Sequence, residues 1–263
     1  MSSSSSSNTK AQRRDAAREQ ARKLREAQAK REKRNRSLII AGVLALVVVV
    51  GIALYVIISQ GNKSVIESVA DVPANTSVQD GGISLGSDLV AGTENSGAPV
   101  LDVYLDFSCP HCATFEEINA DDIDSLVAAG EATVVYHPVA ILDGSGGEYT
   151  GFSGRAVNAA GIVADQAPEA YNAFQEGMFK LFAGASAEPT DKEIAATAVE
   201  AGVPQKVADT IAAGEHPYKD WVAATTKQFS RDGFTGTPTV LINGKEFDGW
   251  SEPGALVEAL KNQ

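Results

Sequence analysis

Cysteine is nearly absent from this sequence, which has only Cys109 and Cys112 among its 263 residues. A disulfide between positions so close together would stabilise little as a structural staple, because loop-closure stabilisation grows with loop length. Only three histidines are present, and a zinc site usually needs four protein ligands, so the composition argues against zinc. The sequence also lacks a G-x-S-x-G elbow, a phosphate-binding loop and a dinucleotide-binding glycine motif. These absences leave the two thiols as the main chemical feature.

Charge is distributed very unevenly along the chain. The net charge is -12, yet Lys10 to Arg36 contains twelve basic and four acidic residues, about +8. The remainder, with ten basic and thirty acidic residues, carries about -20. Such asymmetry indicates that the two parts work in different environments. The basic part could in principle bind nucleic acid, but the apolar run that follows it favours a membrane setting, so no nucleic-acid partner is expected.

Residues 38–58 form an uncharged apolar run of about twenty residues. As a helix this run would be about 30 Å long, the thickness of a hydrocarbon core. A cleavable signal peptide would have a shorter apolar region and a small-residue cleavage site, which residues 55–60 do not offer. We therefore predict a single transmembrane signal anchor over 38–58, preceded by a disordered, basic cytoplasmic tail over 1–37. The positive-inside rule then places the residues after Gln60 outside the cytoplasm, anchored in the cell membrane.

The remaining sequence predicts a linker and one α/β domain. Residues 59–97 are rich in Asn, Ser, Gly and Asp and predict a linker, with room for one edge strand near 83–85. The folded domain is expected over 98–263. Residues 100–107 predict a strand buried on both faces, followed by a helix from Pro110 to Gly130 and a second strand over 132–139. A strand–helix–strand order of this length implies parallel pairing.

A helical block is predicted over about 150–230. An aromatic and methionine stripe within it has helical spacing and predicts core packing. Thr190 with Glu193 is a capping-box signature that begins a further helix. After this block, Asn243-Gly244 predicts a hairpin between two strands, and residues 252–261 predict a closing helix.

The segment Cys109-Pro110-His111-Cys112 lies where the first strand ends and the helix begins. Unpaired N–H groups at a helix N-terminus stabilise a thiolate, so Cys109 is the expected nucleophile. Cys112, one turn deeper, is the expected resolving thiol. Pro110 suits the first helical position and limits the freedom of the loop, and His111 could stabilise the thiolate as a cation or donor. Glu116 and Glu117 are expected on a solvated helix face, the alternative being a proton relay to Cys112.

The order of these motifs resembles that of the DsbA family of the thioredoxin superfamily. The resemblance rests on residues 107–112 and on residues 236–244, Gly-Thr-Pro-Thr-Val-Leu-Ile-Asn-Gly, on either side of the helical block. It implies a thioredoxin fold with an inserted helical subdomain, here preceded by the single transmembrane helix. It also implies a cis bond before Pro238, facing the thiols, with Thr237 and Pro238 contacting substrate. The anchored form with a basic tail is similar to actinobacterial members.

The resemblance further implies an oxidase of exported proteins. The expected substrates are unfolded exported proteins with free thiols, and a membrane partner, quinone-linked in this reading, would reoxidise the pair. No organic cofactor or metal is required, and a monomer is expected. Two alternatives stay open: an anchored reductase or isomerase that uses the same thiols, and a chaperone module that binds chains without turnover.

Overall fold

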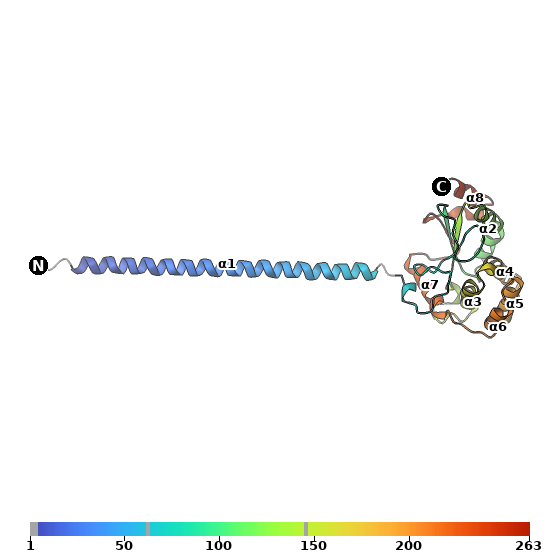
Figure 1. Ribbon diagram of the computed structural model, residues 1–263, viewed down its shortest axis with the longest axis horizontal. Coiled ribbons are helices and arrows are strands. Elements are labelled where there is room, and N and C mark those ends of the chain that lie inside the picture. Colours follow the sequence, from blue (N-terminus) through green and yellow to red (C-terminus); the bar gives the residue numbers. More distant parts are fainter. Residues whose placement is uncertain (1–4, 62–63, 145–146) are drawn as a thin grey trace. The chain divides into compact units, whose positions relative to one another are not determined.

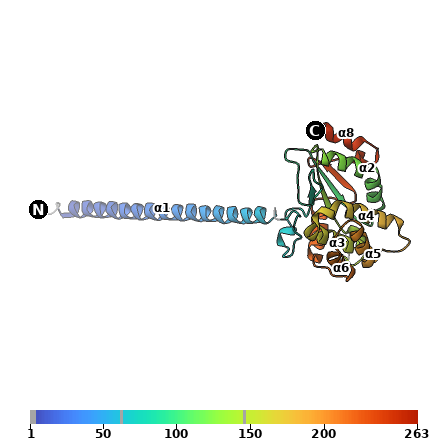
Figure 2. The same cartoon turned by 45° about the vertical axis from the view of Figure 1, so that its right-hand side comes forward.

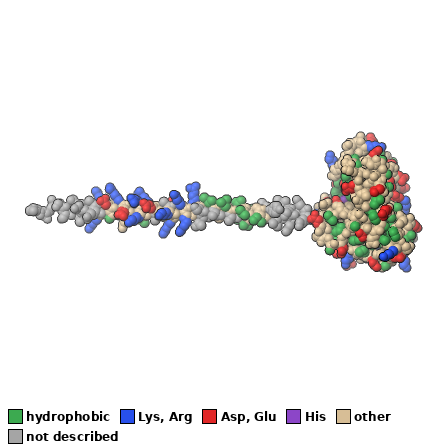
Figure 3. Space-filling view, viewed as in Figure 1, with side chains coloured by type: hydrophobic (Ala, Val, Ile, Leu, Met, Phe, Trp, Pro, Cys, Tyr) green, Lys and Arg blue, Asp and Glu red, His purple; other side chains and the backbone are tan. Residues whose placement is uncertain are grey.

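The computed structural model describes residues 5–61, 64–144 and 147–263, and the chain divides into two units, residues 1–62 and 63–263 (Figure 1). The first unit contains one long helix, α1 (Ser5–Gly61). Its first half is rich in good helix formers, and Glu19 pairs with Lys23 one turn away at 3.0 Å. Residues 5–37 of the predicted tail are helical in this structure, while residues 1–4 lie outside the described part. Basic side chains gather along the described N-terminal half of α1 (Figure 3).

The predicted membrane span, residues 38–58, falls within α1. Several of its side chains, including all those of residues 53–58, lie outside the described residues. A search of the part of the chain that is described finds no helix with an apolar stretch long enough to cross a membrane.

The second unit is built on a five-stranded mixed sheet of order β1-β3-β2-β4-β5. The strands are β1 (Ile83–Leu85), β2 (Val100–Leu105), β3 (Thr133–Pro138), β4 (Thr239–Ile242) and β5 (Lys245–Glu246). Strand β2 lies in the centre and pairs in parallel with β3, as predicted, and antiparallel with β4. Asn243 and Gly244 both adopt positive φ, as a tight turn between β4 and β5 requires.

Helices flank the sheet and fill one end of the unit. They are α2 (Pro110–Ala128), α3 (Phe152–Gln166), α4 (Tyr171–Gly184), α5 (Asp191–Glu200), α6 (Gln205–Ala212), α7 (Lys219–Arg231) and α8 (Ala255–Lys261), with short 3-10 turns at Ile66–Ser68, Ile141–Asp143, Pro168–Ala170 and Asp248–Ser251. Helix α2 contacts both α4 and α8, and α7 contacts β3. Helices α3, α5 and α6 lie together at the end of the unit opposite α8 (Figures 1 and 2). The helical block predicted over 150–230 is thus confirmed as α3 to α7.

The core explains how this block attaches to the sheet. The stripe residues Tyr171, Phe174 and Met178 are fully buried, which confirms core packing for this part of α4. The predicted capping box is also present: the Thr190 side chain accepts from the Glu193 backbone, and the Glu193 carboxylate accepts from the Thr190 backbone. The buried side chains of α3 to α7 and those of β1 to β4 belong to one hydrophobic core.

The linker predicted over 59–97 is wrong from residue 64 onward. Ile66, Ile83 and Leu85 are fully buried in the core of the second unit. Strand β1 pairs antiparallel with β3 at one end of the sheet, which confirms the predicted edge strand. The polar composition misled the prediction because polar side chains here bind distant parts of the same unit: the Asn95 side chain, for example, donates to the carbonyls of Val127 and Ala132.

Candidate active site around Cys109 and Cys112

The two cysteines lie at the junction of β2 and α2. Strand β2 ends at Leu105, and α2 begins at Pro110, whose fixed φ suits the first helical position. Cys109 is the N-cap residue, with extended backbone angles of φ -86° and ψ 119°. Both cysteines are free thiols, Cys109 5% exposed and Cys112 1% exposed. The sequence pattern therefore placed the dithiol correctly at a helix N-terminus.

Cys109 is in an environment that favours its thiolate. Its pKa is lowered to about 5, chiefly because the Cys112 side chain donates a hydrogen bond to it. Partial burial opposes this shift, but the Thr237 side chain and the backbone N–H groups of Cys112 and His111 lower the pKa further. The amides are those left unpaired at the start of α2. His111 thus contributes through its backbone, and the role predicted for its exposed side chain stays a prediction.

Cys112 has the opposite character. Burial, the hydrogen bond it gives to Cys109 and the negative charge of the Cys109 thiolate all raise the pKa of Cys112 well above its ordinary value. A thiolate is the reactive form of cysteine, so only Cys109 is prepared to react at neutral pH. The roles predicted for an attacking and a resolving thiol stay predictions, and they require a difference of this kind between the two pKa values.

Thr237 and Pro238 meet the dithiol from the other end of the chain. The Thr237–Pro238 peptide bond is cis, as the family resemblance implied. The Thr237 carbonyl oxygen lies 3.2 Å from Cys109 Sγ and accepts a hydrogen bond from its thiol form. Because this contact favours the protonated thiol, it opposes the groups that lower the Cys109 pKa. The antiparallel pairing of β4 with β2 brings these two segments together.

Asp106 is a buried anchor of the motif that the sequence analysis missed. It is fully buried, and Oδ1 accepts from the Ser108 backbone N–H at 2.9 Å while Oδ2 accepts from that of Leu142 at 3.0 Å. The hydroxyls of Ser108 and Ser153 also donate to Oδ1. Burial raises the Asp106 pKa, and these hydrogen bonds counteract the rise. A polar residue inside an otherwise apolar strand end was the available signal.

The position of Glu116 differs from the solvent-exposed position predicted for it. Glu117 is exposed, as predicted, but Glu116 is only 6% exposed and lies between α2 and α4. Burial raises the pKa of Glu116 to about 8, and the nearby Glu176 carboxylate adds to the rise. The prediction that Glu116 is exposed to solvent was wrong because α4 covers this side of α2. The residue pattern of α2 alone does not show that another helix packs there. The alternative of a proton relay to Cys112 stays a prediction.

Comparison with known proteins places this arrangement in a family. A family model described as thioredoxin matches residues 85–262, about two thirds of the chain. The oxidised DsbA of Mycobacterium tuberculosis is 32% identical over 69% of this chain and 91% of its own, with a TM-score of 0.56. The chain belongs to the DsbA family of the thioredoxin superfamily. Within this DsbA-family chain the family model includes β2, the dithiol and Pro238.

Two further proteins are similar to this DsbA-family chain. MdbA from Actinomyces oris, described as a thiol-disulfide oxidoreductase, is 28% identical over 78% of this chain and 98% of its own, with a TM-score of 0.64. The serine/threonine-protein kinase PknE of M. tuberculosis is 28% identical over 190 residues. That match spans 70% of this chain but only about a third, 32%, of the kinase.

Proposed function

We propose that this chain introduces disulfide bonds into exported proteins through the Cys109–Cys112 pair. The observation that carries the proposal is the contrast between the two thiols, one with a pKa lowered to about 5 and the other held protonated by burial. A stabilised Cys109 thiolate stabilises the reduced protein, and this makes the disulfide form an oxidant. The structural relatives described as thiol-disulfide oxidoreductases support the same reading.

The cycle follows from these assignments. A substrate thiolate attacks Cys109 Sγ of the oxidised pair, forming a mixed disulfide and releasing Cys112 as a thiolate that takes up a proton. A second substrate thiolate then attacks the substrate sulfur of the mixed disulfide and expels Cys109, which leaves as the stabilised thiolate. Two electrons pass from the substrate to the pair, and the substrate gains one disulfide. A membrane partner, for which we propose a quinone-linked protein, accepts these electrons and restores the oxidised pair.

The reduction potential of the pair tests the direction of this cycle. The full chain, purified in detergent and equilibrated in glutathione buffers, is expected to have a potential above about -200 mV, well above the ~-270 mV of thioredoxin. The physical reason is the stabilised Cys109 thiolate of the reduced form. A value at or below that of thioredoxin would instead favour the alternative of an anchored reductase or isomerase.

We also propose that residues 38–58 anchor the protein in the cell membrane with the dithiol outside the cytoplasm. The support is the uncharged run itself and the basic residues that precede it. Because the chain has only two cysteines, topology can be read by labelling single introduced cysteines in a Cys109→Ser/Cys112→Ser background. Ser186→Cys is expected to react with an impermeant maleimide in intact cells, and Ala16→Cys only after permeabilisation. The reverse pattern, or equal labelling, would contradict the proposed topology.

A further inference from the structure

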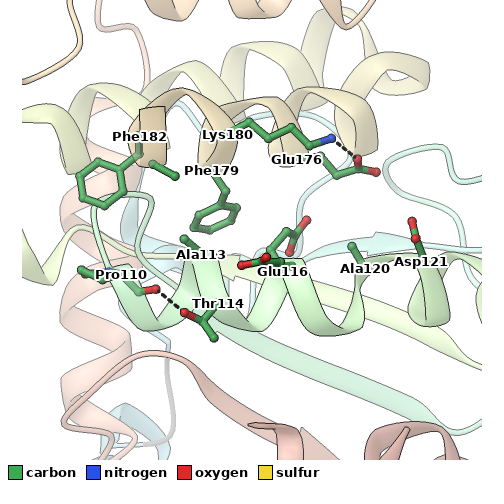
Figure 4. Close-up of a pocket in the computed structure, with 12 residues that line it drawn as sticks. Pro110, Ala113, Thr114, Glu116, Ala120, Asp121, Glu176, Phe179, Lys180 and Phe182 are labelled. Atoms are coloured by element: carbon green, nitrogen blue, oxygen red, sulfur yellow. Dashed lines mark hydrogen bonds and ion pairs between the residues drawn. The ribbon is translucent and has the colours of Figure 1, made fainter. Parts of the chain in front are cut away.

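A groove of about 620 Å³ runs between α2 and α4 beside the dithiol. Pro110 and Phe182 lie at one end of it, and Asp121 and Glu176 lie at the other (Figure 4). Ala113 and Phe179 face each other across its middle and make that part apolar (Figure 4). Since Pro110 follows Cys109 directly, the apolar end of the groove starts next to the reactive thiol.

Glu116 is the buried polar side chain of this groove. It comes from α2 and lies on the side facing α4, near Phe179 and Glu176 (Figure 4). Its Oε2 atom is buried and has no hydrogen-bond partner of ordinary geometry, and the neighbouring Gln175 side chain offsets only part of the rise in the Glu116 pKa. Buried carboxylate oxygens normally have donors, and leaving one without a donor costs free energy. Because the Glu116 side chain lines the groove, a ligand in the groove could supply the donor that this carboxyl group lacks.

The charges around the groove show which donor fits. Four carboxylates line it, from Glu116, Glu117, Asp121 and Glu176, against a single ammonium, from Lys180. That ammonium pairs with Glu176 at 3.1 Å, and the Lys180 side chain is 77% exposed. Its effect on Glu116 is smaller than that of burial and of Glu176, so the pKa of Glu116 remains raised. A basic ligand group would relieve both the excess negative charge and the unpaired oxygen.

The spacing along α2 sets where such a group would lie in an extended peptide. Glu116 lies seven positions after Cys109 along α2, a distance of about 10 Å at ~1.5 Å per residue. An extended chain covers ~3.3–3.6 Å per residue, so about three residues of peptide span this distance. The apolar stretch between the two positions suits an apolar side chain on the way.

We propose that this groove is a substrate subsite that binds an extended polypeptide segment with an apolar side chain, followed by a lysine or arginine about three residues from the reacting cysteine. Phe179, Phe182 and Ala113 contact the apolar side chain, and Glu116 accepts hydrogen bonds from the basic group. The subsite rests on the proposed function, since its peptide is the substrate of the dithiol. It gives the enzyme a preference among the thiols of unfolded chains.

The test is equilibrium binding of short fluorescein-labelled peptides to the full chain in nanodiscs. Serine replaces the reacting cysteine in each peptide, so binding is measured without any thiol chemistry. One peptide carries leucines next to the serine and a lysine three residues away, and its partner has glutamine in place of lysine. Above pH 8, where Glu116 with its pKa of about 8 is mostly ionised, wild type is expected to bind the lysine peptide at least about tenfold more tightly, because the glutamine peptide leaves the Glu116 carboxylate without a cation.

Two matched variants test whether the preference for the lysine peptide depends on the Glu116 carboxylate. Glu116→Gln is expected to abolish the discrimination between the peptides, because it keeps the shape of the side chain but cannot ionise. Glu131→Gln removes an exposed carboxylate that follows α2 and does not line the groove, and is expected to leave the discrimination unchanged. Equal binding of both peptides by wild type, discrimination that survives Glu116→Gln, or self-association in place of peptide binding would each overturn the subsite. Disulfide formation by the same preparations, tested on a reduced protein substrate, reports separately on the proposed function.

Discussion

Replacing Cys109 with serine is expected to lower the rate of disulfide formation in a reduced protein substrate by at least about a thousandfold. The reason is that the sulfur of Cys109 is the atom through which the substrate disulfide must pass, and a hydroxyl cannot form the mixed disulfide. The fold should survive, since serine is smaller and can still accept from the amides at the start of α2. Refolding of a reduced, multi-disulfide test protein with the oxidised enzyme measures the rate directly.

A companion variant and a control sharpen this result. Cys112→Ser keeps the reactive thiol but removes the resolving one, so stable mixed disulfides with substrate are expected on non-reducing gels. Lys206→Ala, at an exposed position on α6, which packs against α3 and α5, should leave the rate unchanged. If Cys109→Ser retained the ability to promote correct folding, the protein would be acting as a chaperone rather than through its dithiol.

The stability of the reduced protein is expected to depend on pH through the same thiol. The pKa of Cys109 is about 5 in the folded protein and about 8.5 in an unfolded chain. Between these values the unfolded state binds the proton that the folded state lacks, so the free energy of unfolding rises with pH. The contribution of Cys109 is therefore complete above about pH 8.5, falls as the pH is lowered, and is lost below about pH 5.

Chemical unfolding of reduced wild type and of reduced Cys109→Ser, compared at a series of pH values, isolates this contribution. Glu116 also titrates in this range, with a raised pKa and the opposite sign, and the comparison cancels its effect because both proteins contain it. Thiolate absorbance near 240 nm gives the midpoint itself, expected near pH 5. Cys112→Ala should raise the midpoint by removing the leading donor, whereas Cys112→Ser keeps a donor. A midpoint near 8.5 in wild type would refute the stabilised thiolate.

Local patterns in the sequence predicted most of the fold. The parallel β2–α2–β3 unit, the helical block, the hairpin at Asn243-Gly244 and the capping box at Thr190 each depend on residues close together in the chain. Such features are set by turn chemistry and periodicity, and sequence reasoning reaches them directly. The position of the dithiol at a helix N-terminus belongs to the same class.

The failures all involve packing between distant segments. Residues 64–97 look like a linker by composition, yet Ile66 and Leu85 are buried because α7 and β3 lie beside them. Glu116 reads as a solvated residue until α4 covers it. Asp106 looks unremarkable until the Leu142 backbone N–H and the Ser153 hydroxyl reach it from later segments. Each depends on a contact that no local pattern encodes.

The contact between Cys109 and Thr237 joins residues 128 positions apart. This separation affects the Cys109 thiol while the chain is still being synthesised and folded. Domains are synthesised from the N-terminus, and contacts between distant segments form late because loop closure must come first. The two thiols therefore leave the ribosome long before β4 and Thr237 are available. Most donors that lower the Cys109 pKa belong to the start of α2, but the Thr237 side chain belongs to the later segment. The pKa of Cys109 therefore reaches its folded value only after β4 has docked against β2, so part of the acidity of this thiol is a product of completed folding.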